Sequence, residues 1–338
     1  IMFMFMGIAF LEDSGYMARV AFMLDRVFRI FGLHGSSVMA FIVSGGIAGG
    51  CAVPGVMATR TLKSPRERLA TLLTVPFMNC GAKLPVFALL VAAFFATHEA
   101  LVMFILTLVS WAGALLVAKL LRSTVVRGAS TPFVMELPPY RLPTARAVLM
   151  RVTERSGLYL RKAGTVILGI SIILWALTTY PRPASYQVDR ELAAGAPLGQ
   201  EEVQARRAAE NLQHSVTGRI GTALEPVFRP LGFDWRIVTA SLGAFAAKEV
   251  FVSQMSIVYA LGEEGAETDL QAKLRRDFSP RVGIALMIFL LVGTPCMATV
   301  AVVRRESGSW KWAWGQFFGL TVLAYVLAAT AYTLGGLV

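Results

Sequence analysis

The chain has 338 residues, of which only 16% are charged while 56% are hydrophobic. Soluble domains carry about 25% charged residues, so this composition excludes an ordinary soluble protein and predicts an all-α membrane protein, a polytopic helical bundle. The net charge of +11 lies in short basic stretches between apolar runs. That distribution is typical of membrane loops and argues against a nucleic-acid partner.

The first apolar run, Ile1–Leu11, has no initiator Met and no charged segment before it, so it does not resemble a signal peptide. We expect the chain to begin inside a helix, with further sequence upstream. Glu12 and Asp13 end this run. Two interpretations stay open for them: a helix terminus with a capping role, or coordination of an entering cation. The following stretch, Tyr16–Phe31, is predicted to be an amphipathic helix in the membrane interface.

The next segments set the orientation. Basic residues crowd the loop from Arg60 to Arg68 and recur nine times from Lys119 to Lys162, so both stretches are predicted to be cytoplasmic. Within the second stretch, Arg141–Lys162 is predicted to be another interfacial helix or a solvated linker. The predicted spans are Leu69–Thr97, Leu101–Ala118, Ala163–Tyr180, Val282–Val303 and Trp312–Val338.

The stretch Pro181–Arg236 balances seven basic against seven acidic residues, as expected of an outer loop, and Glu201–Gln213 has the composition of a helical insert. Beyond it, full crossing by both Ile237–Gly262 and Val282–Val303 would place Arg304 and Arg305 outside. One of these two segments is therefore predicted to be re-entrant or broken.

Three apolar segments contain glycine and proline at membrane depth, and each holds one cysteine. They are Gly35–Thr59 around Cys51, Pro76–Pro85 around Cys80 and Gly293–Thr299 around Cys296. Glycine and proline free backbone carbonyls that a continuous helix would use. Interrupted segments that recur in both halves of a chain are the best sequence indication of a transporter's binding site.

Thiol and thioether groups suit a transition metal, and Met57, Met78 and Met297 lie near the three cysteines in sequence. The alternative is that each cysteine is a small buried hydrophobe. Because conduction needs sites that release the ion, we expect sequential or partial ligands that also include Asn79 and backbone carbonyls. Structural disulfides are not expected.

Ionisable residues inside apolar segments are the second signal, because a functional site is their usual meaning. Lys83 interrupts one segment, and Lys248 and Glu249 interrupt another. Neighbours on a helix point in different directions, so Lys248 and Glu249 cannot simply pair and at least one of them needs another partner. A structural pair of Glu249 with Lys83 and an ion-path carboxylate are both left open. The sequence contains no P-loop and no nucleophile–base arrangement, so we expect no catalytic site.

Seven further motifs occur along the chain: Leu11–Arg19, Val56–Leu62, Asn79–Pro85, Glu136–Tyr140, Pro230–Arg236, Ala247–Val250 and Thr294–Thr299. In this order they resemble the FeoB ferrous iron transporter family, and the likeness runs from about Gly7 to Tyr332. The resemblance implies a multi-pass domain of the bacterial inner membrane with two gate-like halves, distantly similar to nucleoside carriers. These halves would be 1–120 and 163–338, the latter with the outer loop 181–236, joined by a cytoplasmic linker at 121–162.

The resemblance further implies transport of Fe²⁺ into the cytoplasm, gated by an upstream G domain that binds GTP and Mg²⁺ and is absent from this sequence. Cysteines of these motifs are proposed to line the iron path in that family, which carries over to Cys51, Cys80 and Cys296. Where the family has Asn after the first of them, this chain has Ala52, which removes one potential ligand. Small Feo-type accessory proteins and a homo-oligomer are further partners to consider. The competing hypotheses are a carrier of another divalent metal or an organic solute, and a membrane receptor or scaffold.

Overall fold

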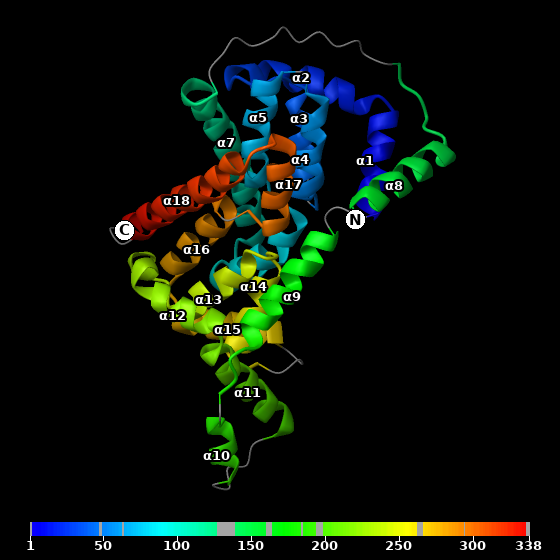
Figure 1. The fold of residues 1–338 in the computed structure, drawn as a ribbon. Helices are drawn as coiled ribbons and strands as arrows, with labels where there is room; N and C mark the ends of the chain where they lie inside the picture. The colour runs from blue at the N-terminus through cyan, green and yellow to red at the C-terminus, as the bar shows by residue number, and fades with distance from the viewer. Residues whose placement is uncertain are drawn as a thin grey trace. The chain divides into compact units, whose positions relative to one another are not determined.

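The computed structural model describes residues 2–46, 49–62, 64–126, 139–159, 164–183, 185–193, 199–261, 266–293 and 295–335. Within these ranges every regular element is a helix, which confirms the all-α prediction (Figure 1). Four helical segments are long and apolar enough to cross a membrane: Pro65–Phe94, Glu99–Thr124, Pro280–Ser307 and Trp310–Leu334. By length and composition they support a multi-pass membrane protein.

The helices form two compact units that interleave along the chain. Unit 1 comprises Ile1–Leu84, Ile105–Ile167 and Ala298–Gly319, and unit 2 comprises Pro85–Phe104, Leu168–Met297 and Leu320–Val338. The sequence alone predicts two contiguous halves in place of these interleaved units. Interleaving arises because Arg275 donates to the carbonyl of Ala93 at 2.8 Å within unit 2, while Gln316 bonds to Leu72 and Leu73 within unit 1.

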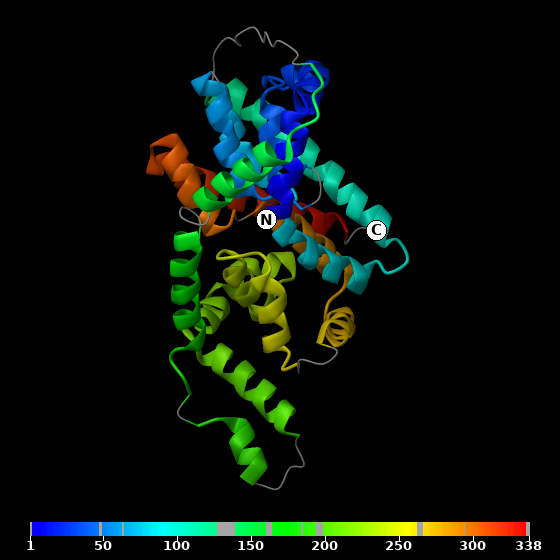
Figure 2. The same ribbon diagram turned by 90° about the vertical axis from the view of Figure 1, so that its right-hand side faces the viewer.

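Unit 1 is a bundle of helices, several of them short because the chain is interrupted between α3 and α4 and between α5 and α6 (Figure 1; Figure 2). Aromatic rings fill its core, with Phe41 5.6 Å from Phe28 and 6.0 Å from Trp111 between ring centroids. Its elements are α1 (Met2–Asp13), α2 (Tyr16–Ile30), α3 (Ser37–Phe41), the π-helix Ile42–Gly46, α4 (Ala52–Ala58), the 3₁₀ turn Thr59–Thr61, α5 (Pro65–Thr74), the 3₁₀ turns Val75–Phe77 and Gly81–Lys83, α8 (Ala145–Tyr159), and most of α7 (Glu99–Thr124) and α17 (Met297–Ser307).

The side chain of Gln316 shows why unit 1 includes the start of the last helix. Pro76 has no N–H, so the carbonyl of Leu72 loses its helical donor. The Gln316 amide replaces that donor, with hydrogen bonds of 3.1 Å to Leu72 and 2.8 Å to Leu73. A buried polar group thus satisfies carbonyls that the proline leaves open.

Unit 2 packs around a second aromatic cluster, in which Phe289 lies 5.7 Å from Phe228 and 5.8 Å from Phe233 between ring centroids. The Asp234 carboxylate caps α13 by accepting the N–H of Ile237 at 3.0 Å. The elements of unit 2 are α6 (Leu84–Phe94), α9 (Thr165–Thr179), α10 (Gln187–Ala193), α11 (Gln200–His214), α12 (Val216–Phe228), the 3₁₀ turn Arg229–Leu231, α13 (Trp235–Ala244), α14 (Val250–Val258), α15 (Ala266–Asp277), α16 (Pro280–Val292) and most of α18 (Trp310–Leu334).

Several predicted elements are helices with nearly the predicted bounds. The amphipathic stretch at 16–31 is α2, and the insert expected at Glu201–Gln213 is α11. The predicted span Ala163–Tyr180 holds α9, whose 15 residues are fewer than the roughly 20 that a span needs. One of two segments was predicted to be broken, and the structure shows a break in both. Ile237–Gly262 divides into α13 and α14, and Val282–Val303 divides into α16 and α17.

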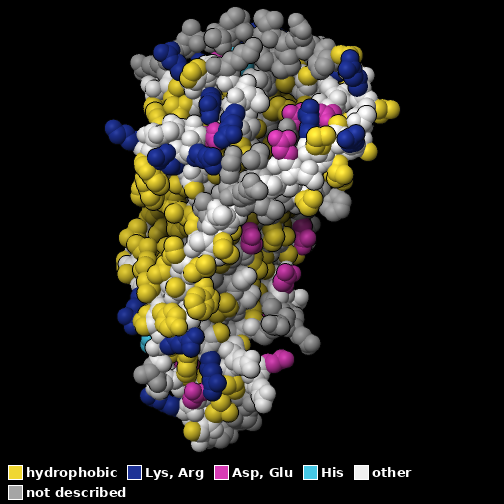
Figure 3. Space-filling model, turned by 45° about the vertical axis from the view of Figure 1, so that its right-hand side comes forward, with side chains coloured by type: hydrophobic (Ala, Val, Ile, Leu, Met, Phe, Trp, Pro, Cys, Tyr) yellow, Lys and Arg dark blue, Asp and Glu magenta, His cyan; other side chains and the backbone are white. Residues whose placement is uncertain are grey.

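Large apolar side chains are exposed along the long helices. They include Leu101, Phe104 and Leu108 on α7, and Phe318, Val322 and Val326 on α18. Figure 3 shows one face on which apolar side chains lie side by side over a broad area. Such a surface suits a chain solvated by lipid, because water would oppose its exposure.

Candidate ion path

The first helix break in unit 1 follows the π-helix Ile42–Gly46 and ends at Cys51. Its backbone folds back on itself, so that the N–H of Cys51 donates to the carbonyl of Val43 at 3.1 Å. Gly45 has a φ of +128°, which side chains disfavour. A Cβ on Gly45 would lie 2.2 Å from the carbonyl oxygen of Asn79, so only glycine lets the two chain segments come this close.

The second break in unit 1 lies between α5 and α6 and contains Asn79 and Cys80. The N–H of Gly81 donates to the carbonyl of Gly50 at 2.8 Å. Since Cys80 precedes Gly81 and Cys51 follows Gly50, this bond brings the two cysteine-bearing breaks together. Both cysteines are half-buried, and neither forms a disulfide.

Lys83 is buried, at 4% exposure, and its ammonium donates to the carbonyls of Pro76 and Met78 at 3.2 Å each. The carbonyl between them, that of Phe77, accepts from the Ser110 hydroxyl at 2.6 Å. The carbonyls that this break frees therefore already have donors. Lys83 stabilises the broken backbone, and these carbonyls are less suited as ion ligands than the sequence analysis expected.

Asn79 is 5% exposed, and its Nδ2 lies 3.4 Å from the Thr107 hydroxyl. Its Oδ1 is buried and accepts no hydrogen bond from the described residues. A buried amide oxygen without a donor is costly unless something else binds it. This oxygen, beside Cys80, is available to a cation. Met57 lies half-buried on α4, while Met78 is fully buried.

Unit 2 contains two breaks of the same kind, Phe245–Glu249 between α13 and α14, and Gly293–Cys296 between α16 and α17. The N–H of Met297 donates to the carbonyl of Phe245 at 2.9 Å. Lys248 is buried, and its ammonium lies 3.5 Å from the carbonyl of Gly293. Cys296 is half-buried and forms no disulfide, as is true of the cysteines of unit 1.

The two units therefore use one arrangement twice. In each, the residue after a cysteine donates its N–H to the partner break: Gly81 to Gly50, and Met297 to Phe245. A buried lysine in each bonds to freed carbonyls. By this hydrogen bond Cys296 corresponds to Cys80, and the residue corresponding to Cys51 is Ala246. Unit 1 thus has two thiols at its breaks and unit 2 has one.

Buried polar side chains on α13 and α14 were not selected from the sequence. Ser241 Oγ and Gln254 Oε1 are buried and make no hydrogen bond with the described part of the chain. A Cβ on Gly243 would lie 2.0 Å from Gln254 Oε1, so the amide lies against the end of α13. Polar residues within the apolar stretch Ile237–Gly262 were the signal that could have found them.

Glu12 and Asp13 end α1, as one of the two interpretations held. Asp13 forms an ion pair of 2.6 Å with Arg151 of α8. A capping role and cation coordination both stay predictions for Glu12 and Asp13. The suggested pair of Lys83 with Glu249 joins residues of different units and stays a prediction; Glu249 is exposed.

Among the described residues, no three His, Cys, Asp or Glu side chains are grouped closely enough to hold a metal ion. Each unit alone offers few ligands. Within the described ranges the arrangement therefore differs from the closed set of four ligands typical of a structural metal site.

Broken helices paired inside apolar segments, and repeated in two units, define the architecture of a polytopic membrane transport protein. The sequence matches the family described as nucleoside recognition (Gate) over residues 1–94 and 160–310, and the family described as ferrous iron transport protein B C terminus over residues 103–155. The chain belongs to the FeoB family of ferrous iron transport proteins.

Curated relatives agree along nearly the whole chain. A Porphyromonas gingivalis protein, named as a fusion of Fe(2+) transport protein A and Fe(2+) transporter FeoB, is 40% identical over 99% of this chain and 42% of its own length. The Fe(2+) transporters FeoB of Helicobacter pylori and Methanocaldococcus jannaschii are each 37% identical, over 98% and 99% of this chain and 53% and 47% of their own lengths. The chain thus spans about half the length of these relatives. No solved structure matches it.

Proposed function

We propose that this chain forms the membrane path by which Fe²⁺ enters the bacterial cytoplasm across the inner membrane. The observation that carries the proposal is the repeated pairing of helix breaks, each pair joined by a backbone hydrogen bond beside a cysteine. Relatives named as Fe(2+) transporters support ferrous iron as the substrate.

In this proposal the ion exchanges part of its water shell for Cys51, Cys80 and Asn79 Oδ1 in unit 1, and for Cys296 in unit 2. Met57 is a further thioether ligand at α4. Soft thiol ligands favour Fe²⁺ over Mg²⁺ or Ca²⁺. With Ala52 in place of the family Asn, unit 1 relies on its thiols and on Asn79. No catalytic role is proposed for this chain.

Gating by GTP and Mg²⁺ is proposed to come from a G domain of the full-length protein. The relative that joins Fe(2+) transport protein A to the transporter supports a small accessory protein as a second partner. A homo-oligomer is a third proposal. In it, the exposed apolar faces of α7 and α18 would be available for contacts between copies of the chain.

Uptake of radiolabelled Fe²⁺ tests the proposed path. Cells with Cys51→Ser, Cys80→Ser and Cys296→Ser combined are expected to take up iron about 10-fold more slowly, since losing groups at a metal site weakens binding by this order. Met57→Leu is expected to lower uptake, whereas Met23→Leu, on the exposed face of α2, serves as its matched control.

Three results would contradict this proposal in whole or in part. Undiminished uptake by the triple variant at equal protein abundance would remove the thiols from the path. Full competition by Mn²⁺, Zn²⁺ or an organic solute would indicate a different carrier. Fe²⁺ binding without any uptake would favour a receptor or scaffold.

A further inference from the structure

Unit 1 contains a cavity of about 310 Å³ outside the helix breaks. Three candidate spans begin or end at its walls: Pro65 starts one, Ser307 ends another, and Trp312 lies in the first turn of a third. The cavity therefore lies at the level where helices leave the bilayer. By its basic loop this is the side predicted to be cytoplasmic.

The walls of the cavity combine two chemistries. Leu62, Leu69, Leu72 and Trp312 provide an apolar surface. Arg68, Glu306 and Ser307 provide charged and polar groups at the same cavity. A ligand that fills it needs both an apolar part and a group that bonds to a guanidinium.

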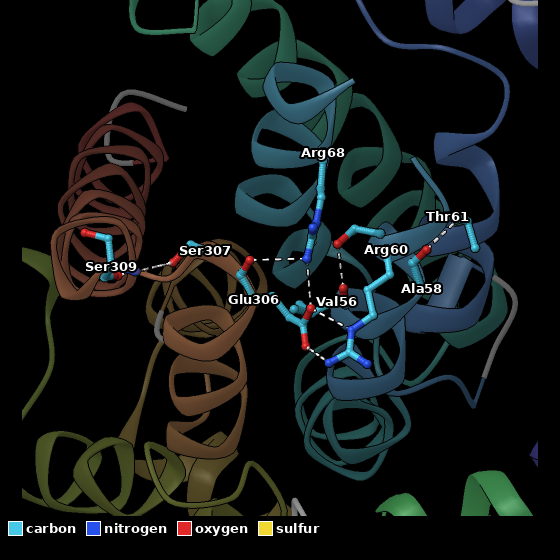
Figure 4. Close-up of polar contacts among 9 residues, drawn as sticks. Val56, Ala58, Arg60, Thr61, Arg68, Glu306, Ser307 and Ser309 are labelled. Atoms are coloured by element: carbon cyan, nitrogen blue, oxygen red, sulfur yellow. Dashed lines mark hydrogen bonds and ion pairs between the residues drawn. The ribbon is translucent and has the colours of Figure 1, made fainter. Parts of the chain in front are cut away.

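Glu306 of α17 is the centre of the polar wall, and Figure 4 shows two arginines pointing toward it. Its carboxylate is 3% exposed and accepts from Arg60 Nε at 2.8 Å and from Arg68 at 3.0 Å, while a second Arg60 nitrogen also bonds to it. This hydrogen bonding raises the pKa of the Arg60 guanidinium, so it stays charged. Two cations sharing one anion leave a net positive charge.

Further basic residues lie next in sequence to residues of the cavity wall. Arg66, Arg305 and Lys311 are exposed, and Arg304 lies 5.2 Å from the ring of Trp310. Arg68 Nε makes no hydrogen bond to the described residues. Basic pockets between membrane helices on the cytoplasmic side are suited to anionic lipid head groups, and tryptophan marks the interface level.

We propose that this cavity binds one anionic phospholipid. Its phosphate lies beside the Arg68 guanidinium, which forms charge-assisted hydrogen bonds with phosphate. One acyl chain runs along Leu69, Leu72 and Trp312. A soluble anion would leave this apolar wall uncovered, so the lipid is the better occupant. The site is separate from the proposed iron path.

Native mass spectrometry of the full-length protein in detergent tests the site with three probes: phosphatidylglycerol, phosphatidylcholine and glycerol 3-phosphate. The wild type is expected to retain one phosphatidylglycerol and neither of the other probes. Arg68→Gln and Leu69→Trp are each expected to weaken its retention about 10-fold, the equivalent of one charge-assisted contact.

Leu69→Trp decides between a lipid site and a merely structural ion pair, because it fills the cavity while keeping Arg60, Arg68 and Glu306. Arg276→Gln and Leu101→Trp, at exposed positions elsewhere, are the matched controls and are expected to bind like the wild type. Unchanged retention in Leu69→Trp would overturn the proposal. So would equal retention of phosphatidylcholine, or equally tight binding of glycerol 3-phosphate. Melting temperatures of all variants verify that each is folded.

Discussion

Gly45 is a residue at which the two helix breaks of unit 1 lie in close contact. Gly45→Ala adds a Cβ 2.2 Å from the Asn79 carbonyl, at a backbone φ of +128°. We expect it to lower the free energy of unfolding by at least about 2 kcal/mol, from strain and the displaced break. Thermal unfolding in detergent measures this change.

The matched control for Gly45 is Gly319→Ala in α18, where an added Cβ meets nothing within 4 Å. Alanine favours a helix over glycine by up to about 1 kcal/mol, so this variant is expected to be neutral or more stable. Equal stability of the two variants would mean that the close approach at Gly45 does not hold the break.

Lys83 and Lys248 are buried lysines whose need for a partner, but not the partner itself, could be predicted from the sequence. Both were selected from the sequence because an ammonium at membrane depth needs a partner. Their partners are backbone carbonyls, of Pro76, Met78 and Gly293. Sequence could not identify these carbonyls, because they are orphaned only once the helices break and become accessible only through tertiary packing.

At the scale of elements, a backbone hydrogen bond links the two helix breaks of unit 1. The N–H of Gly81 donates to the carbonyl of Gly50. Gly81→Pro removes this N–H and places its Cδ where the hydrogen pointed at the Gly50 carbonyl, so that carbonyl has to move away. The residue before it is compatible with proline, because Cys80 already has an extended φ of −68° and ψ of 157°. We expect a loss of at least about 1–3 kcal/mol in stability, the cost of leaving a buried carbonyl unpaired, together with slower Fe²⁺ uptake.

Gly81→Ala keeps the N–H and places its Cβ 3.4 Å from the carbonyl of Gly49, an ordinary contact. It is therefore the control for the proline variant and should behave like the wild type in thermal unfolding and uptake. Similar losses in both variants would show that side-chain volume, and not the hydrogen bond, matters at this position.

Three of the four helix breaks were predictable because glycine or proline marks them. The break at Phe245–Glu249 contains neither, and only the placement of Arg304 and Arg305 indicated that something in this region was broken. It exists because the carbonyl of Phe245 accepts the N–H of Met297, far along the chain. A break made by a tertiary contact leaves no local signal in the sequence.

At the scale of the whole molecule, each unit is built from separate segments of the chain. The sequence alone predicted two contiguous halves and did not predict this exchange of segments. Pro85–Phe104 belongs to unit 2, and Ala298–Gly319 to unit 1. Helix composition predicts that a segment is buried in lipid or protein, but it does not predict which neighbour it packs against. Side chains such as Gln316 and Arg275 determine that choice.

The molecule is also asymmetric in its thiols. Unit 1 has Cys51 and Cys80 at its joined breaks, whereas unit 2 has Cys296 opposite Ala246. The account therefore predicts that sulfur binds the ion more completely in unit 1, where Asn79 Oδ1 adds an oxygen.

Iron K-edge X-ray absorption of the full-length protein, loaded with Fe²⁺ without oxygen, tests most directly whether these thiols bind the ion. We expect iron–sulfur scattering in the wild type, weaker in Cys51→Ser with Cys80→Ser, weaker again once Cys296→Ser is added, and absent when Met57→Leu is combined with all three. A wild-type spectrum with only oxygen and nitrogen neighbours, unchanged in the triple variant, would contradict it.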